Sequence, residues 1–122
     1  MKQLDIVIPH ERLDDVNRIL YKNKVGGMMY YDIKGRGRAE RQPVEDRLSE
    51  EAGGYNTGRK YVPEFGSRTK IEVLVPDSTY KHIVDDILNT ISSGSAADGK
   101  IFIKDISEAY DIGSKQGGDS AL

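Results

Sequence analysis

Cysteine and tryptophan are absent from the 122 residues of this chain, and histidine occurs only twice, as His10 and His82. Without cysteine the chain has no disulfide, no thiolate nucleophile and no cysteine-based zinc site. Two histidines without ligand spacing do not make a metal site within one chain. The absence of cysteine suits a reducing compartment, and we expect a cytoplasmic protein.

Long apolar runs and a large excess of charge of one sign are also missing. The apolar runs have the length of a strand, so we expect no membrane insertion, and the chain opens without a secretory signal pattern. A formal net charge of −2 does not support a broad basic face for nucleic acid. With 37% hydrophobic and 31% charged residues, the composition predicts a single domain over residues 1–122 with one core.

Strand and helix patterns alternate along the chain. Some segments alternate apolar and polar residues, and others repeat apolar residues at helical spacing. The expected strands cover residues 4–8, 28–33, 70–75 and 100–103, and the expected helices cover residues 13–23 and 80–91. This βαββαβ order predicts an α+β, ferredoxin-like fold, in which a four-stranded antiparallel sheet carries both helices on one face.

The other face of the sheet is expected to be uncovered. We place Val7, Met28, Tyr30 and Leu74 on it. An apolar face without cover favours self-association.

Three segments lie between or after these elements. Residues 36–67 are rich in glycine and charge, with a short helix expected near residues 43–52, and residues 92–99 form a second loop. A loop as long as the first is usually functional. The segment 114–122 is rich in glycine and serine, and we expect a flexible C-terminal tail.

Several short motifs follow one another in a specific order. They are Gly27-Met28, Lys34-Gly35-Arg36-Gly37-Arg38, Tyr61-Val62-Pro63-Glu64-Phe65, Lys70-Ile71-Glu72-Val73 and Asp98-Gly99-Lys100-Ile101-Phe102. In this order and spacing the chain resembles the PII family of nitrogen regulatory signal-transduction proteins, over almost its whole length. The first loop, which corresponds to the family's T-loop, looks about ten residues longer than usual, an extension that surface loops tolerate.

The resemblance implies a function that composition and spacing do not reveal. PII proteins are homotrimers of ferredoxin-like subunits. They bind ATP or ADP in clefts between subunits, often sense 2-oxoglutarate, and dock the T-loop onto other proteins. The resemblance therefore implies a regulator rather than an enzyme. Its partner would be an ammonium transporter or a metabolic enzyme, and its signal carbon, nitrogen or energy status.

The resemblance also implies a nucleotide site. Glycines let backbone N–H groups approach a phosphate, and basic side chains add charge-assisted hydrogen bonds. The implied residues are Gly27, Met29, Gly35, Gly37, Arg38, Arg68, Glu72, Leu74, Gly94, Asp98, Gly99 and Lys100. Of these, Glu72 and Leu74 match the adenine pocket, and Arg68 stands where the family has a lysine. Taken alone, each residue also fits a plain turn, a solvated charge or a core position.

The chain departs from the family at several ligand positions. Ala39 replaces a glutamine that serves magnesium and 2-oxoglutarate, so neither is expected to bind in the usual way. Met29 replaces a threonine that bonds adenine, and Ser95, Asp111 and Gly113 replace basic residues. Each lost charged hydrogen bond costs ~1.5–3 kcal/mol. We therefore expect AMP, ADP, cyclic AMP or another small anion to be preferred over magnesium-bound ATP.

Candidate catalytic residues are lacking. No serine, histidine and aspartate arrangement and no pair of carboxylates stands out. Tyr61 lies where some bacterial relatives carry a tyrosine that is uridylylated, and we expect it to contact a protein partner. Two alternatives remain open: a ligand-independent trimeric interaction module with a degenerate pocket, and, less favoured, a small enzyme on this scaffold.

Overall fold

The computed structural model describes residues 1–37 and 65–122. Arg38, Ala39, Tyr61 and the helix expected near residues 43–52 lie outside the described residues. No helix within these two ranges is long and apolar enough to cross a membrane.

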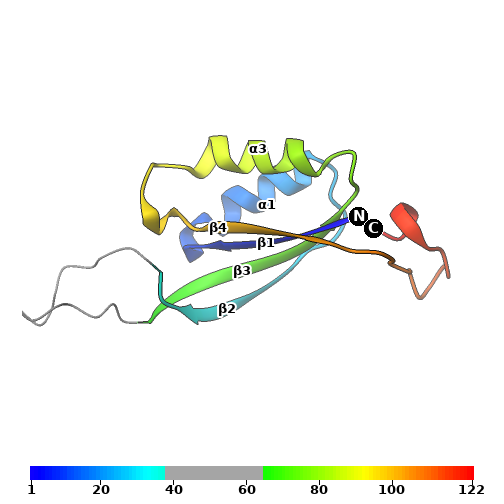
Figure 1. Cartoon of the computed structure of the whole chain (residues 1–122), viewed down its shortest axis with the longest axis horizontal. Helices are drawn as coiled ribbons and strands as arrows, with labels where there is room; N and C mark the ends of the chain where they lie inside the picture. The colour runs from blue at the N-terminus through cyan, green and yellow to red at the C-terminus, as the bar shows by residue number, and fades with distance from the viewer. Residues whose placement is uncertain (38–64) are drawn as a thin grey trace, which may run out of the picture.

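The sheet has four antiparallel strands in the order β2-β3-β1-β4. The strands are β1 (Lys2–Ile8), β2 (Met29–Gly35), β3 (Gly66–Val75) and β4 (Lys100–Asp105). The helices are α1 (Leu13–Lys22) and α3 (Tyr80–Ile91), with short 3-10 turns η1 (His10–Arg12), η2 (Ala96–Asp98) and η3 (Gly118–Ala121). Figure 1 shows both helices on one face of the sheet. The predicted ferredoxin-like arrangement is confirmed.

The core lies between the helices and the sheet. Alternate residues of the two central strands point to the helices, and each helix contributes one apolar stripe. The buried apolar side chains are Leu4, Ile6, Ile8, Val16, Ile19, Leu20, Ile71, Val73, Val75, Ile83, Ile87 and Ile91. Burying each one fully contributes about 1.5–3 kcal/mol to folding.

The opposite side of the sheet, called the open face below, carries the alternate side chains of each strand, those that point away from the helices. Its side chains are Gln3, Asp5, Val7, Met29, Tyr31, Ile33, Arg68, Lys70, Glu72, Leu74, Lys100, Phe102 and Lys104. The sequence predicts Val7 and Leu74 on this face correctly, but the placement of Met28 and Tyr30 is wrong. Tyr30 is opposite the buried Ile71, and Met28 packs against the core. Side chains alternate with a period of two, so an assignment shifted by one residue reverses the face.

Strand β3 begins earlier than the apolar pattern predicts. It starts at Gly66, which pairs with Gly35, whereas alternation is visible only from residue 70 onward. Residues 66–69 are Gly-Ser-Arg-Thr, which lack the apolar side chains that reveal a strand. Consequently β2 and β3 form a long hairpin stem, and Arg68 belongs to the strand.

The C-terminal segment folds back on itself, although the sequence predicts a flexible tail from Ser114 onward. Tyr110 pairs with Gly117, and the Gly118 amide donates to the Ala109 carbonyl at 2.9 Å. The Asp111 carboxylate accepts hydrogen bonds from the Ser114 amide and hydroxyl at 3.2 and 2.7 Å. The segment therefore contains a turn followed by η3, and its flexibility stays a prediction.

Candidate functional site

The predicted site residues fall at two ends of the sheet. At one end, called the loop end, β2 finishes at Gly35 and β4 begins at Lys100. At the other, called the tail end, β2 begins at Met29 and the C-terminal segment lies nearby (Figure 1). A single chain brings the predicted residues together in these two groups and does not join them into one site.

The tail end contains a pocket of about 320 Å³. It is lined by Gln3, Gly27, Met28, Met29, Glu72, Val73, Leu74, Ala121 and Leu122. This tail-end pocket gathers four of the predicted ligand residues from β2, β3 and the turn before β2. It also includes the last two residues of the chain, which sequence reasoning misses because a segment rich in glycine and serine gives no signal of a fixed position.

Glu72 adds a carboxylate to the lining of this pocket. Its Oε1 accepts a hydrogen bond from the Tyr31 hydroxyl at 2.8 Å, and the Lys70 ammonium lies 3.5 Å away. The remaining lining is mostly aliphatic and thioether. Such a surface suits a flat, largely apolar ring with a polar edge facing Glu72.

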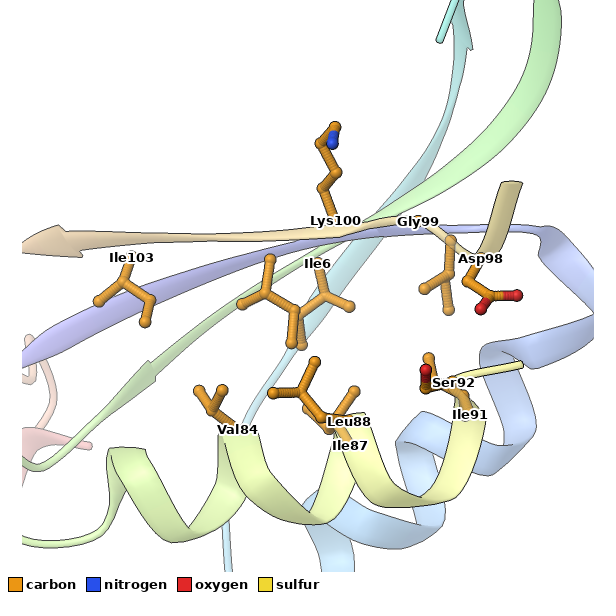
Figure 2. Close-up of a pocket in the computed structure, with 12 residues that line it drawn as sticks. Ile6, Val84, Ile87, Leu88, Ile91, Ser92, Asp98, Gly99, Lys100 and Ile103 are labelled. Carbon is orange, nitrogen blue, oxygen red and sulfur yellow. The ribbon is translucent and has the colours of Figure 1, made fainter. Parts of the chain in front are cut away.

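The turn into β4 depends on Gly99. Its φ is +122°, and a Cβ atom at this position would lie 2.1 Å from the Val7 carbonyl oxygen. Only glycine fits such a conformation and such a close approach. Lys100 follows directly, is exposed, and makes no ion pair with a described residue. Figure 2 shows its side chain pointing away from α3, which places its ammonium group on the open-face side.

Asp98 organises the loop before this turn. Its carboxylate accepts hydrogen bonds from the Ser93 hydroxyl and amide, both at 2.6 Å, and from the Ser95 amide at 3.3 Å. These bonds, led by the one from the Ser93 hydroxyl, hold the pKa of Asp98 below its ordinary value. The Ser95 hydroxyl in turn accepts from the Ala97 amide at 3.1 Å. The structure therefore shows Asp98 in a loop-shaping role, and ligand contact by Asp98 stays a prediction.

The other predicted glycines differ from Gly99. Gly94 has a left-handed φ of +84°, which explains glycine there. Gly27, Gly35 and Gly37 have no such backbone, and a Cβ atom on any of them would meet no described atom within 4 Å. Nothing within the described chain requires glycine at these three positions, and the described residues leave the space beside them open.

Arg68 lies at the loop end beside a polar cavity of about 430 Å³. The cavity is lined by His10, Asp32, Ile33, Lys34, Ser67 and Arg68. The Arg68 guanidinium donates to the Ser67 carbonyl at 3.0 Å, and the Lys34 ammonium donates to the Ser67 hydroxyl at 2.7 Å. Two cations therefore lie close to the point where β2 leaves the sheet.

An apolar groove of about 280 Å³ separates α3 from β4 (Figure 2). Its walls include Ile6, Val84, Ile87, Leu88 and Ile103. Asp98 and Gly99 lie at one end of it, and Lys100 points to the other side of the sheet. With this lining the groove suits neither a phosphate nor proton-transfer chemistry.

No cluster of three or more histidine, aspartate or glutamate side chains suitable for a metal ion occurs within residues 1–37 and 65–122. The tail-end pocket has room for a ring, and Lys100 is exposed at the loop end. Nucleotide binding by these residues stays a prediction.

Similarity to known proteins extends over the whole chain. A family model described as "Nitrogen regulatory protein P-II" matches residues 1–116. Nitrogen regulatory protein P-II 1 of Escherichia coli strain K12 is 32% identical over 122 residues, covering 100% of both chains. The nitrogen regulatory proteins P-II of Klebsiella oxytoca and Haemophilus influenzae are 31% and 28% identical, again over 100% of both chains.

Proposed function

Because the chain belongs to the nitrogen regulatory protein P-II family, we propose that it signals by binding an adenine nucleotide or a related small anion. The resemblance inferred from the motifs is confirmed, and with it a regulatory role in signal transduction. The proposal adds the ligand, the assembly and the partner. It places the protein in the cytoplasm, where it reports carbon, nitrogen or energy status.

The observation that best supports the proposal is the tail-end pocket. The motifs of the sequence imply Gly27, Met29, Glu72 and Leu74 as ligand residues, and these four line one cavity of about 320 Å³. In the proposed complex the base occupies this pocket, and Glu72 accepts hydrogen bonds from the polar edge of the ring. Basic groups at the loop end, Arg68 and Lys100, hold the phosphates.

The separation of the two ends supports assembly into a homotrimer. A nucleotide that contacts both groups of residues must lie between the tail end of one subunit and the loop end of its neighbour. The open face supports the same idea, because Met29, Tyr31 and Phe102 are 65%, 43% and 51% exposed in the single chain. Apolar surface of this kind favours association with further copies.

The proposed ligand carries few phosphates. Ser95, Asp111 and Gly113 supply no positive charge where the family has basic residues. We therefore favour AMP, ADP or cyclic AMP over magnesium-bound ATP, and we do not propose 2-oxoglutarate sensing, since Ala39 offers no ligand atom. Residues 36–67, including Tyr61, are the proposed contact with an ammonium transporter or a metabolic enzyme.

Isothermal titration calorimetry tests the ligand. The purified chain is titrated with ATP, ADP, AMP and cyclic AMP, with and without magnesium. We expect saturable binding of at least one of the last three. Lys100→Ala should weaken ADP more than AMP, whereas Lys81→Ala, a change at an exposed residue of α3, should weaken neither.

Other outcomes of this titration contradict specific parts of the proposal. Tight, magnesium-dependent ATP binding would contradict the ligand preference alone. No heat with any nucleotide would favour the ligand-independent interaction module instead. Turnover of a nucleotide by the purified chain would contradict a purely regulatory role.

A further inference from the structure

The tail-end pocket includes two residues that the family model does not cover. The family model covers residues 1–116, whereas Ala121 and Leu122 line the pocket; the curated relatives align over both. Both residues are partly buried. They line the same pocket as Gly27 and Met29.

Several backbone contacts hold the C-terminus in this place. Gly117 pairs with Tyr110, and a Cβ atom on Gly117 would lie 2.8 Å from the Tyr110 ring, so the two pack closely. The Leu122 amide donates to the Asp119 carbonyl at 3.1 Å, which closes η3. The Leu122 carbonyl oxygen then lies 3.9 Å from the Cβ position of Gly26. The tail is therefore connected to the turn that precedes β2.

The chemistry of the pocket defines what Leu122 can contact. Polar lining comes from Gln3 and Glu72, while Met29, Leu74 and Leu122 present aliphatic or thioether surface. An apolar wall stabilises the face or edge of a ring and does not interact with phosphate. Leu122 should therefore contribute to the free energy of ligand binding only through contact with the base.

We propose that Leu122 is a wall of the ligand site and contacts the base of the bound nucleotide. This inference rests on the proposed function, since it names a further residue of the same site. The site would then include Leu122, which lies outside the residues that the family model covers, although the curated relatives align over it.

Calorimetry with adenosine and ADP tests the inference on the full-length chain. Leu122→Ser should weaken both ligands by the same factor, about fivefold, because half of a buried leucine side chain is lost. Leu122→Met should retain most of the affinity. Ile112→Ser is the matched control, because Ile112 is an apolar tail residue that is 93% exposed, and it should leave both affinities unchanged.

The outcomes separate the inference from the proposed function. If the unaltered chain binds nucleotide and Leu122→Ser binds equally well or more tightly, the inference is wrong and the proposed function stands. If the unaltered chain binds neither adenosine nor ADP, the inference fails, and the proposed function fails as well if AMP and cyclic AMP do not bind either. A loss for ADP that adenosine does not share would also overturn the inference, since it would indicate a phosphate contact.

A second measurement on the ligand-free protein guards against a folding defect. Leu122→Ser should shift the amide resonances of Gly27 and Met29 in a ¹H–¹⁵N spectrum and leave those of the core strands in place. Ile112→Ser should leave the Gly27 and Met29 resonances unmoved. Unchanged Gly27 and Met29 resonances in Leu122→Ser would overturn the wall contact.

Discussion

Glycine has two distinct roles at the residue scale in this protein. Gly99 is required by its own chain, because the Val7 carbonyl oxygen occupies the space of a side chain. Gly27 and Gly35 are not required by any described atom. In the sequence all three glycines stand in similar short motifs. Only the structure shows that a side chain would clash at Gly99 and would meet no described atom at Gly27 or Gly35.

Replacing Gly99 should therefore be costly. Gly99→Ala forces a side chain into the left-handed region and against Val7, so we expect a loss of about 2–4 kcal/mol in the free energy of unfolding. Urea denaturation measures this loss through the transition midpoint. Gly27→Ala is the control and should change stability by less than about 1 kcal/mol. Equal effects of the two substitutions would contradict the assigned roles.

Asp5 is a buried carboxylate on the open face, only 2% exposed. The Lys104 ammonium lies 2.8 Å from Oδ2, Lys70 lies 3.9 Å from the same atom, and the Gln3 amide donates to Oδ1 at 2.8 Å. Burial by itself raises the pKa of Asp5. The hydrogen bonds from Lys104 and Gln3 and the charge of Lys70 outweigh it, so the pKa lies below the ordinary 3.8.

The lowered pKa predicts a specific pH dependence. The ionised form of Asp5 stabilises the fold at pH values above its unfolded-state pKa, and this contribution is lost as the pH falls below about 4. Asp5→Asn should therefore show a shallower loss of stability between about pH 5 and pH 2 than the unaltered chain. Thermal unfolding across this range measures it. Asp85→Asn, an exposed change on α3, should keep the original slope.

At the scale of elements, most of the fold can be predicted because apolar spacing is a direct consequence of burial. Within the described residues, α1, α3 and the four strands overlap the segments expected from the sequence. The errors have physical reasons. The face of Tyr30 is predicted wrongly, because a short run of β-forming residues does not reveal its phase. The start of β3 escapes prediction, because backbone pairing of Gly35 with Gly66 leaves no apolar signal.

The candidate site can be predicted only in part. Gly27, Met29, Glu72 and Leu74 follow from the resemblance, and the structure places them around one pocket. Leu122 cannot be found in this way, because its position depends on the fold of the tail. Ligand contact by these residues stays a prediction.

Helix α3 should show a sharp contrast between neighbouring residues. Ile87 is 1% exposed and Leu88 is 51% exposed. Ile87→Ala should destabilise the protein by about 2–5 kcal/mol, since it removes buried methyl groups and leaves a cavity. Leu88→Ala should cost about 1 kcal/mol or less. Chemical denaturation of the two variants measures the difference, and similar losses would indicate that α3 is rotated relative to the sheet.

For the whole molecule, the open face is a surface on which apolar side chains remain exposed to solvent. The ring of Phe102 and the thioether of Met29 are exposed there, beside ion pairs that link neighbouring strands. The proposed homotrimer covers this face and brings the loop end of one subunit near the tail end of the next. The proposed ligand site therefore depends on the proposed assembly, because its residues would come from two subunits.

Sedimentation measures the assembly directly. We expect the unaltered chain to sediment as a trimer and Phe102→Asp to shift it toward monomer, because a charge then has to be buried at the interface. Ile112→Asp, at a residue that is 93% exposed in the tail, should remain trimeric. A monomeric unaltered chain would contradict the proposed assembly.

The paired ends of β2 and β3 have a consequence for protein engineering. Gly35 and Gly66 are held opposite each other by the sheet itself, so the stem is closed whatever sequence connects them. Doubling the length of such a connection costs only about 0.6 kcal/mol in closure entropy. The position between these glycines is therefore a natural grafting point. A recognition sequence from another protein could be inserted there, and the paired strands of the sheet should keep their register.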